Sequence, residues 1–328
     1  MSAGTLAAPA SVEELLLRSG HAALDLSGAQ HSAWNGRIVE SSDHILGLAH
    51  WDGTLHLDRE YILDPLREMY ALAGREHPTQ QLARYREALA TILHEHSHFL
   101  GPAGATQEAA RDAFVRPGSR QLEEGVAEAW AQVHLNDYLH RLGIDKVAPG
   151  IDSFRTNGQY APFVTAVRML GADLESRGGL APGTILSALN NQTAEHQLPV
   201  MATLYYNSTR LPELEPAGPR TRDHLESVLR SGLAALDKHQ LLPHPQATAR
   251  AKATTQSLLS HLHLEIARAE SLYTRRQVPH PTRTAFAGLP APNASGDLTP
   301  QPPVETARLP APGRRSEAVD ARGAPDRA

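Results

Sequence analysis

Apolar side chains recur every three to four residues along most of the chain, and this spacing is typical of amphipathic helices. The exception lies between residues 37 and 58, where short apolar runs flank Asp52-Gly53, a dipeptide typical of tight turns. The pattern therefore predicts a mostly helical α+β fold, with one small β-hairpin or sheet near the N-terminus and a helical C-terminal half.

Two of the predicted helices carry most of the functional argument. The first covers about residues 79–100, with Thr79 as its N-cap and Gly101-Pro102 as its end. The second covers about residues 119–142, with Ser119 as its N-cap. Further helices are expected at 12–18, within 59–74, and near 160–176, 183–192, 197–207, 221–238 and 245–275.

The composition changes near residue 277, after which ten of the 24 prolines occur. This proline-rich segment, 277–328, contains almost no aromatic residues and is expected to be a disordered tail. Residues 1–276 are then expected to form one domain, in which 150–276 make a helical subdomain.

The 328 residues include 18 histidines and no cysteine. Without cysteine the chain has no disulfides, iron–sulfur clusters, cysteine zinc sites or thiol nucleophiles, so a metal site must use His, Asp or Glu. The net charge of -5 does not favour nucleic acid as a partner. No apolar run is long enough to span a membrane, and the N-terminus lacks the features of a signal peptide. A cytoplasmic protein without membrane partners is therefore expected.

The first of the two helices contains the sequence His94-Glu95-His96-Ser97-His98, which matches the metal-binding pattern HExxH. Residues four apart lie on one helix face, so the imidazoles of His94 and His98 can reach one Zn²⁺ ion. Glu95 is expected beside the open position of the metal, where it can take a proton from water.

Two carboxylates on the second helix are spaced to complete the site. Glu124 and Glu128 are four residues apart and share a face, so Glu124 can be the third zinc ligand and Glu128 can hydrogen-bond a ligand histidine. The neighbouring Glu123 is an alternative third ligand, although the pairing with Glu128 favours Glu124. Gly125 is expected to let the two active-site helices approach closely.

An alternative interpretation of the histidines is a β-strand. In a strand, His94, His96 and His98 would point to one face and form an HxHxH metal site. The helix-forming residues that precede them favour the helix, on which His96 points away and serves in packing.

Together, HEHSH and the downstream EEGVAEAW resemble the gluzincin branch of the zincin metallopeptidases, without matching one family in it. The resemblance covers about residues 40–175. It implies a zincin-like catalytic domain in which His94, His98 and Glu124 bind zinc and Glu95 is the general base. It also implies a Tyr or His that stabilises the oxyanion, for which Tyr160 is the candidate, with Tyr205 and Tyr206 as alternatives.

These observations predict a zinc metallopeptidase that hydrolyses peptide or protein substrates, with the upstream hairpin able to pair with an extended peptide. The competing hypothesis is a zincin-like binding or regulatory domain with a structural metal and no peptidase activity. An open cleft above His94 and His98 would favour the enzyme, and a fourth protein ligand would favour the structural site.

Overall fold

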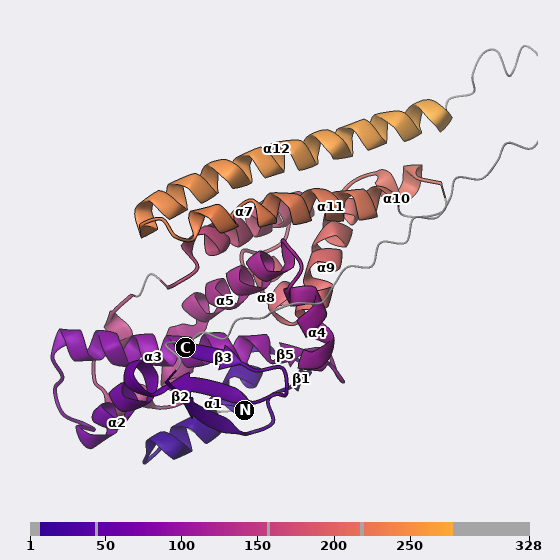
Figure 1. Cartoon of the computed structure of the whole chain (residues 1–328). Coiled ribbons are helices and arrows are strands. Elements are labelled where there is room, and N and C mark those ends of the chain that lie inside the picture. The colour runs from indigo at the N-terminus through magenta and orange to yellow at the C-terminus, as the bar shows by residue number, and fades with distance from the viewer. Residues whose placement is uncertain (1–6, 43–44, 156–157, 217–219, 278–328) are drawn as a thin grey trace, which may run out of the picture. The chain divides into compact units, whose positions relative to one another are not determined.

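Helices make up most of the computed structural model, which describes residues 7–42, 45–155, 158–216 and 220–277 (Figure 1). The mostly helical fold with a small sheet agrees with the apolar pattern. The expected tail lies outside the described residues, except that Gln277 is the last residue of a helix. The α-helices are α1 (Val12–Ser27), α2 (Asp64–Ala71), α3 (Thr79–His98), α4 (Gln107–Phe114), α5 (Ser119–Arg141), α6 (Ile144–Val147), α7 (Ala161–Gly178), α8 (Thr184–Asn190), α9 (Ala194–Asn207), α10 (Leu211–Leu214), α11 (Arg220–Ala234) and α12 (His244–Gln277).

Short strands and single helical turns occupy the remaining regular positions of the described chain. The strands are β1 (His31–Ser32), β2 (Ile38–Ser41), β3 (Gly47–Ala49), β4 (Leu55–Asp58) and β5 (Leu100–Gly101). The short turns are η1 (Arg59–Leu63), η2 (Ile151–Ser153) and η3 (Asp237–His239).

The predicted hairpin is present as β3 and β4, which pair antiparallel on either side of Asp52-Gly53. Gly53 adopts a φ of 83°, a conformation that suits glycine at the turn. Strand β2 pairs with β4 in parallel, so the strand order is β2-β4-β3 and β3 is an outer strand. The apolar pattern did not indicate this parallel pairing.

Helix α1 continues nine residues beyond the predicted end at Arg18. Its N-terminus is as predicted, because Ser11 is the N-cap and its hydroxyl accepts a hydrogen bond from the Glu14 amide (3.3 Å). Gly20 lies inside the helix, where a side chain would strike the ring of Trp34. A glycine here therefore serves close packing and does not end the helix.

The ends of the two helices that carry the candidate site residues differ slightly from the prediction. Helix α3 has Pro78 as its N-cap residue in place of Thr79, and α5 has Gly118 in place of Ser119. Helix α3 also ends at His98, two residues early, because Leu100–Gly101 pairs with β1.

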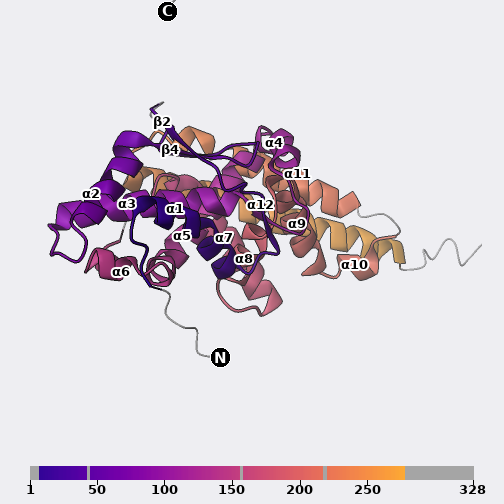
Figure 2. The ribbon, with the colours of Figure 1, turned by 90° about the horizontal axis from the view of Figure 1, so that it is seen from below.

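Two apolar clusters form the core of the described residues, which belong to one compact unit. The first cluster combines α1, the sheet, α2, α3 and the C-terminal part of α5, and Figure 2 shows α1 beside α3. The second combines the N-terminal part of α5 with α7, α8, α9, α11 and α12. Helix α5 thus contributes to both clusters and packs against α3 and α7 (Figure 1).

A hydropathy search of the described helices found none with enough apolar length to cross a lipid bilayer. Even the longest, α12, has a mixed polar and apolar sequence.

Candidate metal centre

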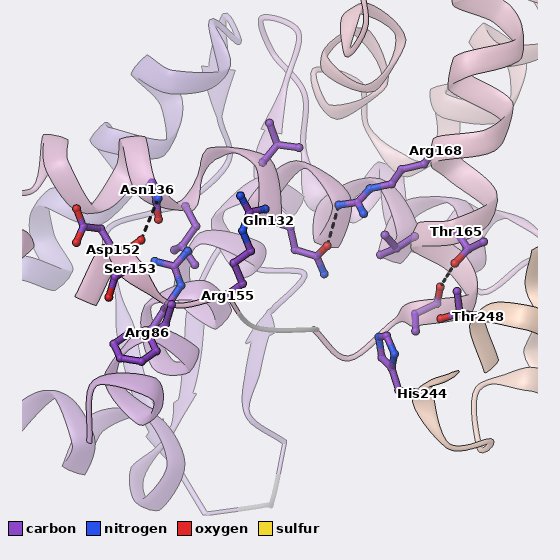
Figure 3. A pocket seen from close by; sticks show the side chains of 15 residues that line it. Arg86, Gln132, Asn136, Asp152, Ser153, Arg155, Thr165, Arg168, His244 and Thr248 are labelled. Atoms are coloured by element: carbon purple, nitrogen blue, oxygen red, sulfur yellow. Dashed lines mark hydrogen bonds between the residues drawn. The ribbon is translucent and has the colours of Figure 1, made fainter. Parts of the chain in front are cut away.

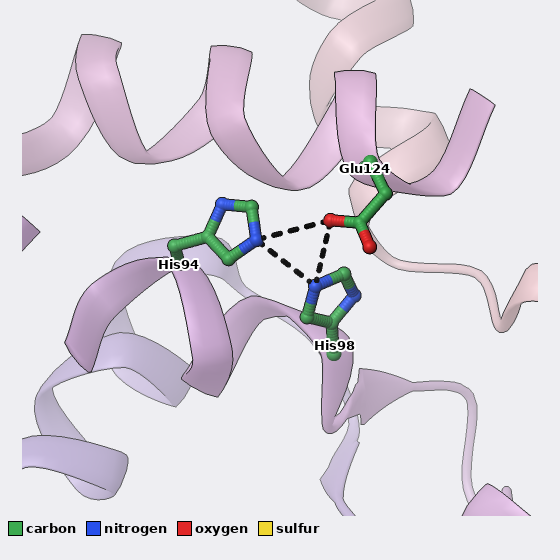
Figure 4. Close-up of side chains that lie close together, drawn as sticks. All are labelled: His94, His98 and Glu124. Carbon is green, nitrogen blue, oxygen red and sulfur yellow. Dashed lines mark hydrogen bonds and ion pairs between the residues drawn. The ribbon is translucent and has the colours of Figure 1, made fainter. Parts of the chain in front are cut away.

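The last two turns of α3 carry His94, Glu95 and His98 into the interior of the protein. The two histidines are one helical turn apart, and their imidazoles lean toward a common point (Figure 4). The Nε2 atoms of His94 and His98 lie 3.1 Å apart. The HxHxH strand alternative is wrong, because residues 79–98 are helical.

Glu124 reaches the same point from the facing helix α5 (Figure 4). Its Oε2 atom lies 3.3 Å from His94 Nε2 and 3.6 Å from His98 Nε2. Two ligands bound to zinc at tetrahedral angles are about 3.3 Å apart, so these three separations suit one ion. Glu124 Oε2 is also buried without a hydrogen-bond partner among the described residues. The residues present therefore fit a metal ion, and they are the group of His, Asp or Glu side chains that could hold one in the described chain.

The outward nitrogen of each histidine faces a different carboxylate of α5. Glu128 Oε2 lies 3.0 Å from His94 Nδ1, within ion-pair distance as the sequence led us to expect, but this contact does not have the geometry of a hydrogen bond. His98 Nδ1 donates a hydrogen bond to Glu123 Oε1 (2.8 Å). Glu123 therefore contacts the Nδ1 atom of His98, whereas the Nε2 atom of the same ring faces Glu124. Such contacts fix which nitrogen of a metal-binding histidine faces the metal.

The role of Glu123 was not anticipated, although a signal for it existed. The spacing of Glu124 and Glu128 assigns an orienting carboxylate to one of the two candidate ligand histidines and none to the other. Because both histidines need a fixed orientation, the adjacent acid Glu123 was a natural second partner.

The charges at this site are strongly coupled. Burial alone would lower the pKa of His94, but the carboxylates of Glu124 and Glu128 outweigh it and raise the pKa to about 10. Burial also opposes protonation of His98, yet Glu123 and Glu124 raise its pKa well above the usual value. Burial favours the neutral form of Glu124, whereas the two imidazoles lower its pKa. Carboxylates therefore create a negative interior that favours a positive charge.

Glu95 lies beside the three converging atoms and is held by the sheet. The Ala49 amide of β3 donates a hydrogen bond to Glu95 Oε2 (2.8 Å). Gly47, on the same strand, leaves room for this side chain, since a Cβ there would lie 2.6 Å from Glu95 Cγ. Burial raises the pKa of Glu95, an effect that makes a carboxylate a better proton acceptor.

A cavity of about 190 Å³ opens onto these residues. Strand β3 and Tyr160 line it, together with Trp51 and Phe114, whose ring centroids are 5.5 Å apart. The Tyr160 ring stacks on His94 with a centroid separation of 5.5 Å. Burial, reinforced by the nearby charges of Glu124 and Glu95, raises the pKa of Tyr160, so its hydroxyl keeps its proton.

The alternative tyrosines do not line this cavity. Tyr205 is buried in the second apolar cluster and its hydroxyl donates to the Leu170 carbonyl (3.3 Å). Tyr206 packs at the edge of the same cluster. Of the three candidates, the structure brings only Tyr160 to the site. Arg120, which sequence reasoning did not single out, also lines the cavity.

His96 and Gly125 contact elements outside the candidate site. His96 faces α1, where its Nε2 atom lies 2.6 Å from the Ser19 hydroxyl, in agreement with the packing role predicted for it. Gly125 allows close packing of α7 and not of α3, so that prediction was wrong about the partner. A Cβ on Gly125 would lie 2.8 Å from the Phe163 carbonyl oxygen. Glu124, the preceding residue, is on the side of α5 that faces α3.

Comparisons of the chain with protein-family models, curated proteins and solved structures found no match. The interpretation of the site therefore depends on its own geometry and chemistry.

Proposed function

We propose that this protein is a zinc-dependent metallopeptidase with a zincin-like catalytic domain. One observation carries the proposal: His94 Nε2, His98 Nε2 and Glu124 Oε2 converge at distances that suit one ion, with Glu95 beside them in an open cavity. Two imidazoles and one carboxylate are a donor set typical of catalytic zinc. When bound, zinc would acidify a water molecule and polarise the scissile carbonyl.

Each side chain then has a distinct part in the hydrolysis. Glu95 accepts a proton from the attacking water and passes it to the leaving amine. Its Oε2 atom is engaged by the Ala49 amide, so Oε1 is the oxygen left for this transfer. Tyr160 keeps its proton and donates a hydrogen bond to the oxygen that becomes negative in the transition state.

Strand β3 supports a peptide as the substrate. It is an outer strand of its sheet and also lines the cavity. An extended peptide can therefore pair with it by β-augmentation, which places a peptide bond next to Glu95. The cavity of about 190 Å³ is smaller than a typical small-molecule site, so most of an extended substrate would lie along the strand.

A structural metal in a binding domain is the competing proposal. A structural zinc site is closed by four protein ligands, whereas three donors converge among the described residues here. His96, which could have supplied the fourth, is engaged with Ser19 on the other side of α3. The open cavity next to the three donors likewise supports a catalytic site.

The test is metal analysis combined with cleavage of a peptide library followed by mass spectrometry. We expect one zinc per chain in wild type and in Glu95→Gln, with cleavage lost by a factor of at least about 100 in the variant, because general acid–base catalysis contributes about that much. Glu87→Gln is the matched control, since Glu87 is an exposed glutamate of the same helix. It should leave both properties unchanged.

Three results would each have a clear meaning. Protein without stoichiometric metal contradicts the whole proposal. Full activity of Glu95→Gln contradicts the catalytic role of this residue. Stoichiometric zinc without cleavage of any peptide by wild type favours the structural alternative.

A further inference from the structure

A second cavity of about 550 Å³ lies elsewhere in the described structure, and none of its lining residues contributes to the first (Figure 3). Residues from α3, α5, α7 and the start of α12 surround it, together with the segment that follows η2. Its volume is in the range of small-molecule binding sites. The cavity therefore has the size to hold a ligand of its own.

Positive charge dominates the lining of this cavity. Arg86, Arg155 and Arg168 contribute to it, against Asp152 as the single acidic residue. Asp152 is already engaged, because its Oδ2 atom lies 2.9 Å from His140 Nε2. Within the described chain none of the three arginines has a carboxylate within ion-pair distance. Three cations thus share one cavity with a single carboxylate, which forms no ion pair with any of them.

Arg86 makes the strongest case because it is only 5% exposed. Its Nη1 atom donates to the Ile151 carbonyl (3.1 Å), but Nε is buried without a partner among the described residues. Burial lowers the pKa of this guanidinium, with a smaller contribution from Arg155, and the nearby charge of Asp152 opposes this shift only in part. A buried charge without a counter-ion is costly, and an anion in the cavity would relieve that cost.

Arg168 supplies a second donor group from the opposite wall. Figure 3 shows its guanidinium extending toward Gln132, whose Oε1 atom accepts a hydrogen bond from Arg168 Nη2 (2.8 Å). This contact positions the guanidinium with a neutral partner and leaves its charge uncompensated. Arginine side chains bind phosphate and carboxylate groups through two parallel hydrogen bonds, which suits a ligand of this type.

We propose that the cavity lined by Arg86, Arg155 and Arg168 binds a small organic dianion, a phosphate ester or a dicarboxylate. Three arginines opposite one aspartate leave a surplus of two positive charges, which matches a dianion. Asn136 and Thr165 also line the cavity, and because each donates to a backbone carbonyl, their side-chain oxygens are left to accept hydrogen bonds from the same ligand. This binding does not depend on a metal at the other site.

Calorimetric titration of the full chain with inorganic phosphate, succinate and sodium chloride at equal ionic strength tests the proposal. We expect saturable binding of phosphate, succinate or both, and none of chloride. Arg168→Gln should weaken the binding at least tenfold, since a charge-assisted hydrogen bond is lost at an exposed position that tolerates substitution. Binding of phosphate alone supports a phosphate ester as the ligand, binding of succinate alone supports a dicarboxylate, and binding of both supports a site that accepts either dianion.

Arg84→Gln is the matched control. Arg84 belongs to α3 like Arg86, but it pairs with Glu68 (3.3 Å) and does not line the cavity. Its removal should leave the affinity unchanged. The proposal is overturned if neither dianion binds more tightly than chloride, or if Arg168→Gln and Arg84→Gln have equal effects. Thermal melting of each variant verifies that a lost affinity is not caused by unfolding.

Discussion

Glu123 and Glu128 each lie against one of the two candidate ligand histidines, Glu123 in a hydrogen bond and Glu128 at ion-pair distance. Glu128 Oε2 lies 3.0 Å from His94 Nδ1, and Glu123 Oε1 lies 2.8 Å from His98 Nδ1. Each carboxylate keeps one imidazole turned so that its Nε2 atom faces Glu124. At the scale of single residues, the site is thus a pair of carboxylate–histidine contacts around one further carboxylate.

Replacing either of these carboxylates should weaken metal binding without removing a ligand. For Glu123→Gln and for Glu128→Gln we expect a loss of zinc affinity of about 10- to 100-fold, because the histidines lose the groups that orient them. Competition with a chromogenic chelator measures the affinity. Glu108→Gln, on the exposed face of α4, is the control. Equal affinities in all four proteins would contradict the role assigned to these contacts.

His96 should make the fold sensitive to acid. Burial lowers its pKa to about 3, whereas a histidine in the unfolded chain has a pKa near 6.5. Below pH 6.5 the unfolded chain therefore binds a proton that the folded protein does not, and stability falls as the pH decreases toward 3. The slope approaches about 1.4 kcal/mol per pH unit for one such group.

Urea unfolding at pH 6.5, 5.5 and 5.0, in the presence of a chelator, measures this dependence. His96→Asn, which cannot take up a proton, should show a shallower loss of unfolding free energy than wild type over this interval. The chelator ensures that release of a metal does not contribute to the difference. Parallel curves for the two proteins would show that His96 is not the group responsible.

At the scale of elements, the site is built where β3 meets α3 and where α3 meets α5. Strand β3 holds Glu95 through the Ala49 amide, and it passes closely over the helix because Gly47 has no side chain. Helix α5 supplies the three remaining carboxylates from one face. The position of the proposed general base is thus determined by a strand, and the proposed ligands by two helices.

A side chain at Gly47 should impair the proposed general base and leave the proposed metal ligands intact. In Gly47→Ala the new Cβ would lie 2.6 Å from Glu95 Cγ, so Glu95 must move while His94 and His98 stay in place. We expect peptide cleavage to fall at least tenfold with zinc content unchanged. Gly171→Ala in α7 is a suitable control, since its Cβ would meet only Ile185 at an ordinary 3.8 Å. If Gly47→Ala retains full activity, the strand does not position the base.

Contacts within one element could be predicted from the sequence, whereas contacts between elements could not. The neighbourhood of His94, Glu95 and His98 follows from spacing within one helix, so it was predictable. The choice between Glu123 and Glu124 depended on the rotation of α5 relative to α3, which is set by packing between distant segments. The same applies to Gly125, whose close neighbour is α7, and to the parallel pairing of β2 with β4.

At the scale of the whole described structure, the candidate metal centre lies between the two apolar clusters. His94 and His98 belong to α3, which packs in the first cluster. Glu124 comes from the part of α5 whose Leu122 and Val126 pack in the second cluster. A bound ion would therefore join elements that belong to different parts of the core.

Removal of the metal should consequently lower the stability of the protein. A ligand that binds only the folded state at 100 times its Kd stabilises it by about 2.7 kcal/mol, and we expect EDTA to reverse a stabilisation of this order. In a thermal melt, the midpoint should fall with EDTA and rise again with added zinc. Glu95→Gln should respond like wild type, and His94→Ala should not respond. Identical midpoints with and without EDTA would contradict a metal that connects the two clusters.

Helix α5 has a further consequence for how the protein can be divided. Trp130 and Tyr138 complete the first cluster, whereas Leu122 and Val126 complete the second. A truncation on either side of α5 removes core residues from one cluster, and a truncation within α5 removes core residues from both. We therefore expect that neither half folds as an autonomous fragment. Gene fusions and insertions are therefore best placed outside residues 119–141.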